Sequence, residues 1–80
     1  MNNSFISLNR LPIGKKGQIM CLNSTGKERR RMLDLGVVQG TTVEALHKSP
    51  SGDPVAYSIR GTVIALRSED AEKVILNAFA

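Results

Sequence analysis

The stretch SPSGDPVAYSIRGTVIAL, residues 49–66, combines turn-forming residues with two short apolar segments. The proline, glycine and aspartate residues at 50–54 do not continue a helix or a central strand, and Arg60-Gly61 places a residue that tolerates positive φ at the second position of a tight turn. The side chains at positions 55, 57 and 59 share one face of the first segment, and those at 62, 64 and 66 share one face of the second. The stretch therefore predicts a β-hairpin within a small β-barrel.

Upstream of this hairpin, the pattern predicts two strands with a helix between them. A Pro/Gly turn at 12–17 leads into a strand near 18–23, and a second strand is expected near 41–47. The helix is expected over 26–35, because Thr25 and Glu28 have the spacing of a capping box and Gly36 is a natural helix stop.

Downstream of the hairpin, Ser68 is expected to cap a short helix whose first turn carries Glu69 and Asp70. A closing strand is then expected at 74–76. Residues 1–7 are expected to form a loosely held lead-in.

The length of 80 residues predicts a single domain, 1–80, with its core over 8–77, and the content of 41% hydrophobic and 22% charged residues is that of a globular protein. The single cysteine, Cys21, excludes an internal disulfide framework. No apolar run is long enough to cross a bilayer, and no secretion signal precedes residue 8. We therefore expect a cytoplasmic protein that meets a membrane only through another protein.

Several motifs in order resemble the ferrous-iron transport protein A family. They are Leu8-x-x-Leu11-Pro12-x-Gly14-x-x-Gly17, Arg30-Arg31-Met32-Leu33-Asp34-Leu35-Gly36-Val37-x-x-Gly40, Gly52-Asp53-Pro54-Val55, and Arg60-Gly61-Thr62-x-Ile64-Ala65-Leu66-Arg67-x-x-Asp70-Ala71-x-x-Val74. The resemblance covers residues 8–76. It implies a mainly β fold with short helices, an SH3-like barrel of about five strands with a helix between strands 1 and 2 and a short helix before the last strand.

The resemblance also implies a function. The family is regarded as an accessory or regulator of the large membrane GTPase-permease for ferrous iron, the ferrous-iron transport protein B type. We therefore expect a protein that binds this permease and modulates its activity without catalysing a reaction. The same small domain also ends certain metal-dependent transcription repressors, which leaves a peptide-binding module as an alternative.

The helix expected at 26–35 is the main candidate docking surface. At about 100° per residue, Met32 and Leu35 fall on one side of the helix while Leu33 faces away from them. Either both sides are buried within the domain, or one apolar side is left for a partner with arginines at its edge. The loop at 49–54, with its exposed tip at Gly52 and Asp53, is a second candidate. The candidate contact residues are Arg29, Arg30, Met32, Leu33, Gly52 and Asp53.

A nucleic-acid-binding barrel is the other alternative, favoured by the net charge of +4. Consecutive arginines at 29–31 fan around a helix rather than forming one stripe, and Tyr57 is expected in the core with its hydroxyl at the rim, so a platform for base stacking is missing. We therefore expect no nucleic-acid partner.

The sequence predicts no catalytic residues, cofactor or metal site. Cys21 and His47 are expected on different strands with no second histidine, so a stable site within one chain would need carboxylates such as Asp53 or a second molecule. The glycines at 14 and 17 precede a strand, which is the wrong context for a phosphate loop, and are expected to form turns.

Overall fold

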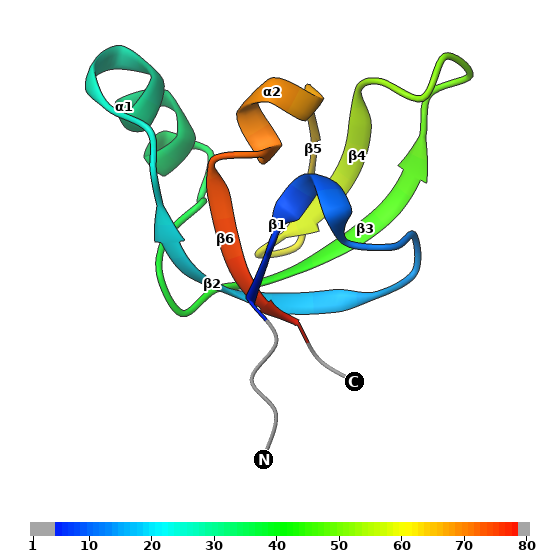
Figure 1. Cartoon of the computed structure of the whole chain (residues 1–80), viewed down its shortest axis with the longest axis horizontal. Helices are drawn as coiled ribbons and strands as arrows, with labels where there is room; N and C mark the ends of the chain where they lie inside the picture. Colours follow the sequence, from blue (N-terminus) through cyan, green and yellow to red (C-terminus); the bar gives the residue numbers. More distant parts are fainter. Residues whose placement is uncertain (1–4, 79–80) are drawn as a thin grey trace.

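The computed structural model describes residues 5–78, which form one six-stranded antiparallel sheet with three short helices against it (Figure 1). The strand order is β1-β6-β2-β3-β4-β5. The elements in chain order are β1 (Phe5–Ser7), the 3-10 helix η1 (Leu8–Arg10), β2 (Lys16–Leu22), α1 (Gly26–Asp34), β3 (Thr42–Lys48), β4 (Val55–Ile59), β5 (Thr62–Leu66), α2 (Ser68–Ala71) and β6 (Val74–Ala78). The mainly β, SH3-like fold is confirmed.

The β4–β5 hairpin forms where the sequence predicts it. Five residue pairs join the two strands without a register shift, from Ile59↔Thr62 at the turn to Val55↔Leu66 at the open end. Both turn residues have positive φ, +55° at Arg60 and +80° at Gly61, so the turn has the geometry that matches the twist of two-residue hairpins. The sequence predicted positive φ at Gly61 alone.

The N-terminal segment differs from its prediction as a loose lead-in. Phe5–Ser7 form β1 and pair with β6, with Phe5 opposite Asn77, so the described sheet has six strands instead of about five. Within residues 5–78 no strand pairing joins β1 to β5, and the sheet is therefore curved but not closed by hydrogen bonds. The predictions of residues 1–4 lie outside the described part of the chain.

The core lies between the concave face of the sheet and the helices. Its largest fully buried side chains are Tyr57, Leu8, Ile19, Met32, Ile59, Leu76, Val37, Val43 and Val74. Tyr57 is 1% exposed and its hydroxyl donates to the Leu8 carbonyl at 3.5 Å, so the predicted position of this hydroxyl at the rim is wrong. Burial, with a smaller effect of the Asp53 charge, raises the pKa of Tyr57 to about 12.

Gly17 lies inside β2 and does not form a turn as the sequence predicted. A Cβ atom built there would lie 3.2 Å from Leu76 Cδ1 and 3.3 Å from the Asn77 carbonyl oxygen. The missing side chain therefore lets β2 and β6 pack closely at this point.

Candidate docking face on helix α1

The ends of α1 follow from its flanking residues. The helix stops at Leu35 because Gly36 takes φ +98°, and the Val37 amide then donates to the Met32 carbonyl at 3.0 Å. This is the hydrogen bond of a Schellman motif, with buried Val37 as its hydrophobic residue. At the other end Thr25 occupies the N-cap position, but its side chain makes no capping hydrogen bond. The predicted capping box of Thr25 and Glu28 is therefore wrong, although the predicted start of the helix is right.

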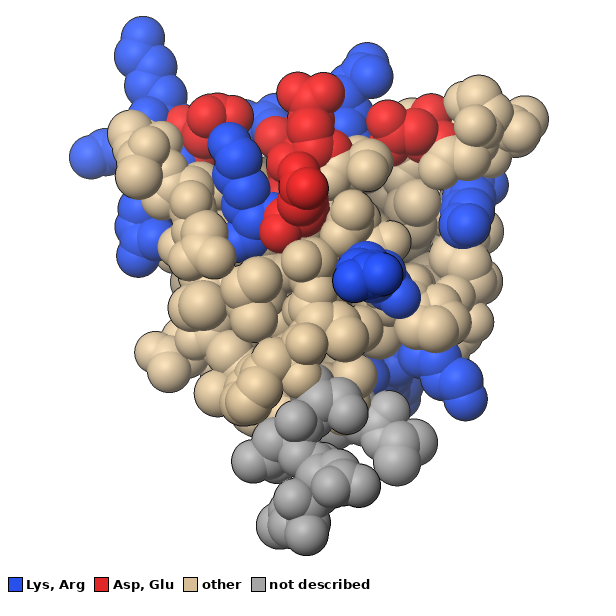
Figure 2. All heavy atoms as spheres, viewed as in Figure 1, with Lys and Arg blue, Asp and Glu red and all other residues tan. Residues whose placement is uncertain are grey.

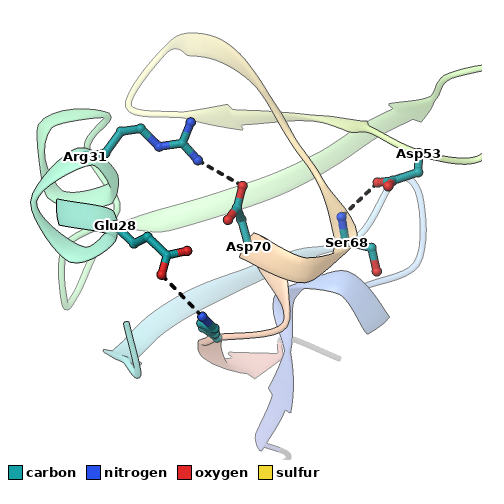
Figure 3. A network of polar contacts seen from close by, with 6 residues as sticks. Glu28, Arg31, Asp53, Ser68 and Asp70 are labelled. Atoms are coloured by element: carbon teal, nitrogen blue, oxygen red, sulfur yellow. Dashed lines mark hydrogen bonds and ion pairs between the residues drawn. The ribbon is translucent and has the colours of Figure 1, made fainter. Parts of the chain in front are cut away.

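The inner side of α1 is held by one core residue and by polar contacts with its neighbours. Met32 is 1% exposed. Arg31 Nη2 lies 2.9 Å from Asp70 Oδ2 of α2, and Glu28 Oε1 lies 3.7 Å from Lys73 Nζ (Figure 3). Arg29 Nη1 donates to the Leu22 carbonyl at the end of β2, at 2.8 Å. These contacts fix which side of α1 faces solvent.

The outer side of α1 carries an open groove of about 360 Å³. It is lined by Gly26, Arg29, Arg30, Leu33 and Asp34. Leu33 is 38% exposed and faces away from Met32, as the helical spacing predicts. Among residues 5–78 the Arg30 side chain makes no hydrogen bond or ion pair, so its guanidinium is available at the edge of the groove.

The surface charge differs between α1 and α2. Lysine and arginine side chains extend from the side of the molecule that holds α1, whereas aspartate and glutamate side chains lie along the upper edge of the view, over α2 and on both sides of it (Figure 2). Helix α2 supplies Glu69 and Asp70, whereas α1 supplies Lys27 and Arg29–Arg31 together with two acidic residues, Glu28 and Asp34, of which Asp34 also lines the groove. The groove beside Leu33 therefore has a basic border on one side.

Of the predicted contact residues on α1, the structure brings Arg29, Arg30 and Leu33 to the groove. Met32 is in the core and its side chain does not reach the surface, so we correct its placement among the contact residues. Gly26 also lines the groove, although the sequence indicated it only as the start of a helix. A Cβ atom built at Gly26 would meet nothing within 4 Å, and the spacing of seven residues, which places Gly26 and Leu33 on the same side of the helix, is the signal that could have revealed it.

The loop at 49–54, the second predicted contact surface, lies in the chain between β3 and β4 and uses its polar groups internally. Asp53 Oδ1 accepts a hydrogen bond from the Ser68 amide at 2.8 Å, at the first turn of α2 (Figure 3). Ser51 Oγ donates to the Asp53 carbonyl at 2.9 Å, and Gly52 takes φ +91°. The predicted capping of α2 by Ser68 is wrong, because Arg67 holds the N-cap position and a carboxylate from a distant loop satisfies the Ser68 amide.

Cys21 and His47 lie on β2 and β3 and are both exposed. In the described part of the chain, no group of three or more histidine, cysteine, aspartate or glutamate side chains is arranged to hold a metal ion. The helices of residues 5–78 are all too short to span a bilayer.

Three comparisons with known proteins agree with this architecture. A fusion of Fe(2+) transport protein A and Fe(2+) transporter FeoB from Porphyromonas gingivalis is 36% identical over 67 residues, which are 84% of this chain and 8% of the fusion protein. The FeoA-like protein of Clostridium acetobutylicum is 31% identical with a TM-score of 0.88, and the match covers 100% of this chain and 92% of that one. The FeoA protein of Stenotrophomonas maltophilia, solved with zinc and described as a prokaryotic SH3 domain protein, is 27% identical with a TM-score of 0.80, over 89% of this chain and 88% of that one.

The model of the FeoA domain matches residues 6–78, which include every strand and helix described above except Phe5, the first residue of β1. The resemblance seen in the sequence motifs is thus confirmed, and the chain belongs to the FeoA domain family.

Proposed function

We propose that this protein is a cytoplasmic accessory protein of ferrous-iron uptake that binds the membrane GTPase-permease for ferrous iron and modulates its activity without catalysing a reaction. Its membership of the FeoA family and the fusion of transport protein A to FeoB in a relative support this proposal. The chain spans 8% of that fusion protein. Joining two domains in one chain raises their effective concentration, which benefits domains that bind each other weakly.

The observation that carries the docking site is the partly exposed Leu33 in a groove bordered by Arg29 and Arg30. An apolar anchor with arginine beside it is typical of the centre of a protein interface. Arg30 is the stronger candidate of the two arginines, because Arg29 already donates to the Leu22 carbonyl. The complementary surface on the permease would present an apolar pocket with a carboxylate at its edge.

The mode of action that we propose is a shift in population. A protein that binds one conformation of the GTPase-permease more tightly than another favours that conformation by the difference in binding free energy. The direction of this shift depends on which conformation presents the complementary pocket.

A binding assay with the purified permease in nanodiscs tests the proposed site. We expect Leu33→Glu to weaken binding by about tenfold or more, because a charge replaces the apolar anchor. Ile13→Glu is the matched control, since Ile13 is 42% exposed against 38% for Leu33 and its turn, between η1 and β2, lies on the side of the molecule away from α1 (Figure 1). Equal binding by the two folded variants would contradict the proposed site.

Nucleic acid is a weaker candidate partner. Two of the three consecutive arginines are engaged within the domain, Arg29 with the Leu22 carbonyl and Arg31 with Asp70. Tyr57 is buried and cannot stack on a base. Binding to DNA or RNA with a steep loss of affinity as salt rises would instead favour that alternative.

A further inference from the structure

The two edges of the sheet are not equally protected against pairing with another strand. Strand β1 is three residues long, which limits what it can pair with. Strand β5 has five residues, Thr62–Leu66, with no proline and no charged residue. Its pairing with β4 shows no register shift, whereas the β2–β6 and β3–β4 pairs each contain one. An edge strand of this kind, long, regular and uncharged, is a template for strand addition.

The free hydrogen-bonding groups of β5 can be assigned from the hairpin. In a two-residue hairpin the residues that flank the turn, here Ile59 and Thr62, form a hydrogen-bonded pair, and bonded and non-bonded pairs then alternate. Ile64 therefore bonds to β4, while the amides and carbonyls of Val63 and Ala65 point away from it. In residues 5–78 no strand lies on that side of β5.

The side chains beside these free groups are apolar and accessible. Val63 is 61% exposed, the largest exposure among the exposed large hydrophobic residues of the described chain, and Ala65 on the same face is also exposed. A peptide added here would thus gain both backbone hydrogen bonds and apolar contact with Val63.

The charges at the two ends of β5 indicate the kind of partner. Arg60 precedes the strand and Arg67 follows it, both are exposed, and within residues 5–78 neither side chain forms an ion pair or hydrogen bond. Each arginine has acidic residues in its surroundings, since Asp53 accepts a hydrogen bond from the Ser68 amide next to Arg67, and Arg60 lies beside Gly36, two residues after Asp34. Two β5 strands paired antiparallel about Ile64 would bring Arg67 of one copy beside Arg60 of the other, which disfavours self-pairing.

We propose that β5 binds an extended segment of another protein as a seventh strand, and that this segment is apolar at its centre and acidic at its ends. This surface is separate from the groove on α1, and the proposal does not depend on the proposed role in iron uptake.

The test uses the full chain and a synthetic peptide of alternating valine and threonine with glutamate at both ends. Amide hydrogen exchange followed by NMR separates the two sides of the strand. With saturating peptide we expect exchange at Val63 and Ala65 to slow by about tenfold or more, while Ile64, already bonded to β4, changes little. Unchanged exchange at Val63 and Ala65, or shifts confined to α1, would overturn the proposal.

Three variants sharpen this test without disturbing the β4–β5 ladder. Val63→Pro removes an outward amide and is compared with Val63→Thr, which keeps it, and we expect only the proline variant to lose binding. Arg60→Asn suits the positive φ at this position and removes a charge, so we expect weaker binding with less dependence on salt. If Val63→Pro does not fold, the exchange data on the unaltered chain still decide whether β5 binds the peptide. A stable dimer in sedimentation experiments without peptide, together with slow exchange at Val63 and Ala65 in that dimer, would show that the occupant is a second copy and would overturn the choice of partner.

Discussion

Helix α1 and the loop at 49–54 both carry exposed polar and charged residues, yet they use them differently. In the loop, the side chains of Ser51 and Asp53 bond to the backbone of the domain itself. In α1, hydrogen bonds and ion pairs join one side of the helix to β2, α2 and Lys73, while Arg30 and Leu33 on the other side make no such contacts with residues 5–78. Exposure alone therefore does not mark a docking surface, because what matters is whether the exposed groups already have internal partners.

The largest expected effect separates the two sides of α1. Met32→Ala removes a fully buried side chain and is expected to lower the free energy of unfolding by about 2 to 4 kcal/mol. Leu33→Ala, one residue along the chain, is expected to cost less than about 1 kcal/mol because Leu33 is 38% exposed. Urea denaturation of both variants measures the difference. Equal losses would mean that α1 is rotated from the position described here.

The next effect concerns the titration of the buried Tyr57 side chain. Tyr57 is the single tyrosine in a chain without tryptophan, so absorbance near 295 nm reports it directly, and we expect an apparent pKa of about 12 in the folded protein. Between the ordinary value of 10.0 and about 12 the unfolded chain has lost this proton and the folded one has not, so stability falls as pH rises. The loss in the free energy of unfolding approaches about 2 to 3 kcal/mol above the higher pKa, and it is absent at pH values well below the ordinary pKa of 10.0.

Asp53→Asn tests the part that the loop plays in this titration. Removal of the carboxylate charge is expected to lower the pKa of Tyr57, but the pKa stays above its ordinary value because burial is the larger cause. An unchanged pKa in Asp53→Asn would mean that the loop charge does not reach the phenol.

The capping contact of the loop is expected to have a smaller effect. Asp53→Ala leaves the Ser68 amide without its acceptor and is expected to cost about 1 kcal/mol in thermal or urea unfolding. Asp53→Asn is the matched control, because its amide oxygen can still accept this hydrogen bond, and we expect it to recover most of the loss. The same loss in both variants would assign the effect to charge instead of capping.

The smallest expected effect is that of the ion pair between α1 and α2. The Arg31 side chain is 59% exposed, so Arg31→Gln is expected to cost at most about 0.5 kcal/mol, and less at high salt. A loss above 1 kcal/mol, measured by urea unfolding at low and high salt, would show that this contact positions α1 far more strongly than solvent screening allows.

The sequence best predicted the elements that are determined by neighbouring residues. The β4–β5 hairpin and the end of α1 at Gly36 follow from turn and cap residues that lie next to the element itself. The opposite sides of Met32 and Leu33 follow from helical geometry alone. These predictions did not depend on contacts with distant parts of the chain.

The features that the sequence did not predict depend on contacts between distant segments. Strand β1 exists because Phe5–Ser7 meet β6, some seventy residues along the chain. Asp53 caps α2 across 15 positions, and Tyr57 is buried because η1 covers it, with Leu8 as its hydrogen-bond acceptor. Arg60 adopts positive φ because a two-residue turn demands it at both positions, against the preference of arginine.

The pairing of Phe5 with Asn77 has a consequence for proteins in which this domain is joined to another. Because Phe5 and Asn77 pair, the described chain enters β1 and leaves β6 at the same pole, at the lower end of these strands in Figure 1, while α1 lies toward the opposite end. The domain measures 36 × 29 × 22 Å, and its 29 Å dimension is vertical in Figure 1, so a tether to a partner that binds α1 has to cover a distance of up to about that dimension. At about 3.3 Å per extended residue, that requires a linker of roughly ten residues. In a fusion, linker length would then decide whether the docking face can reach the protein to which it is attached.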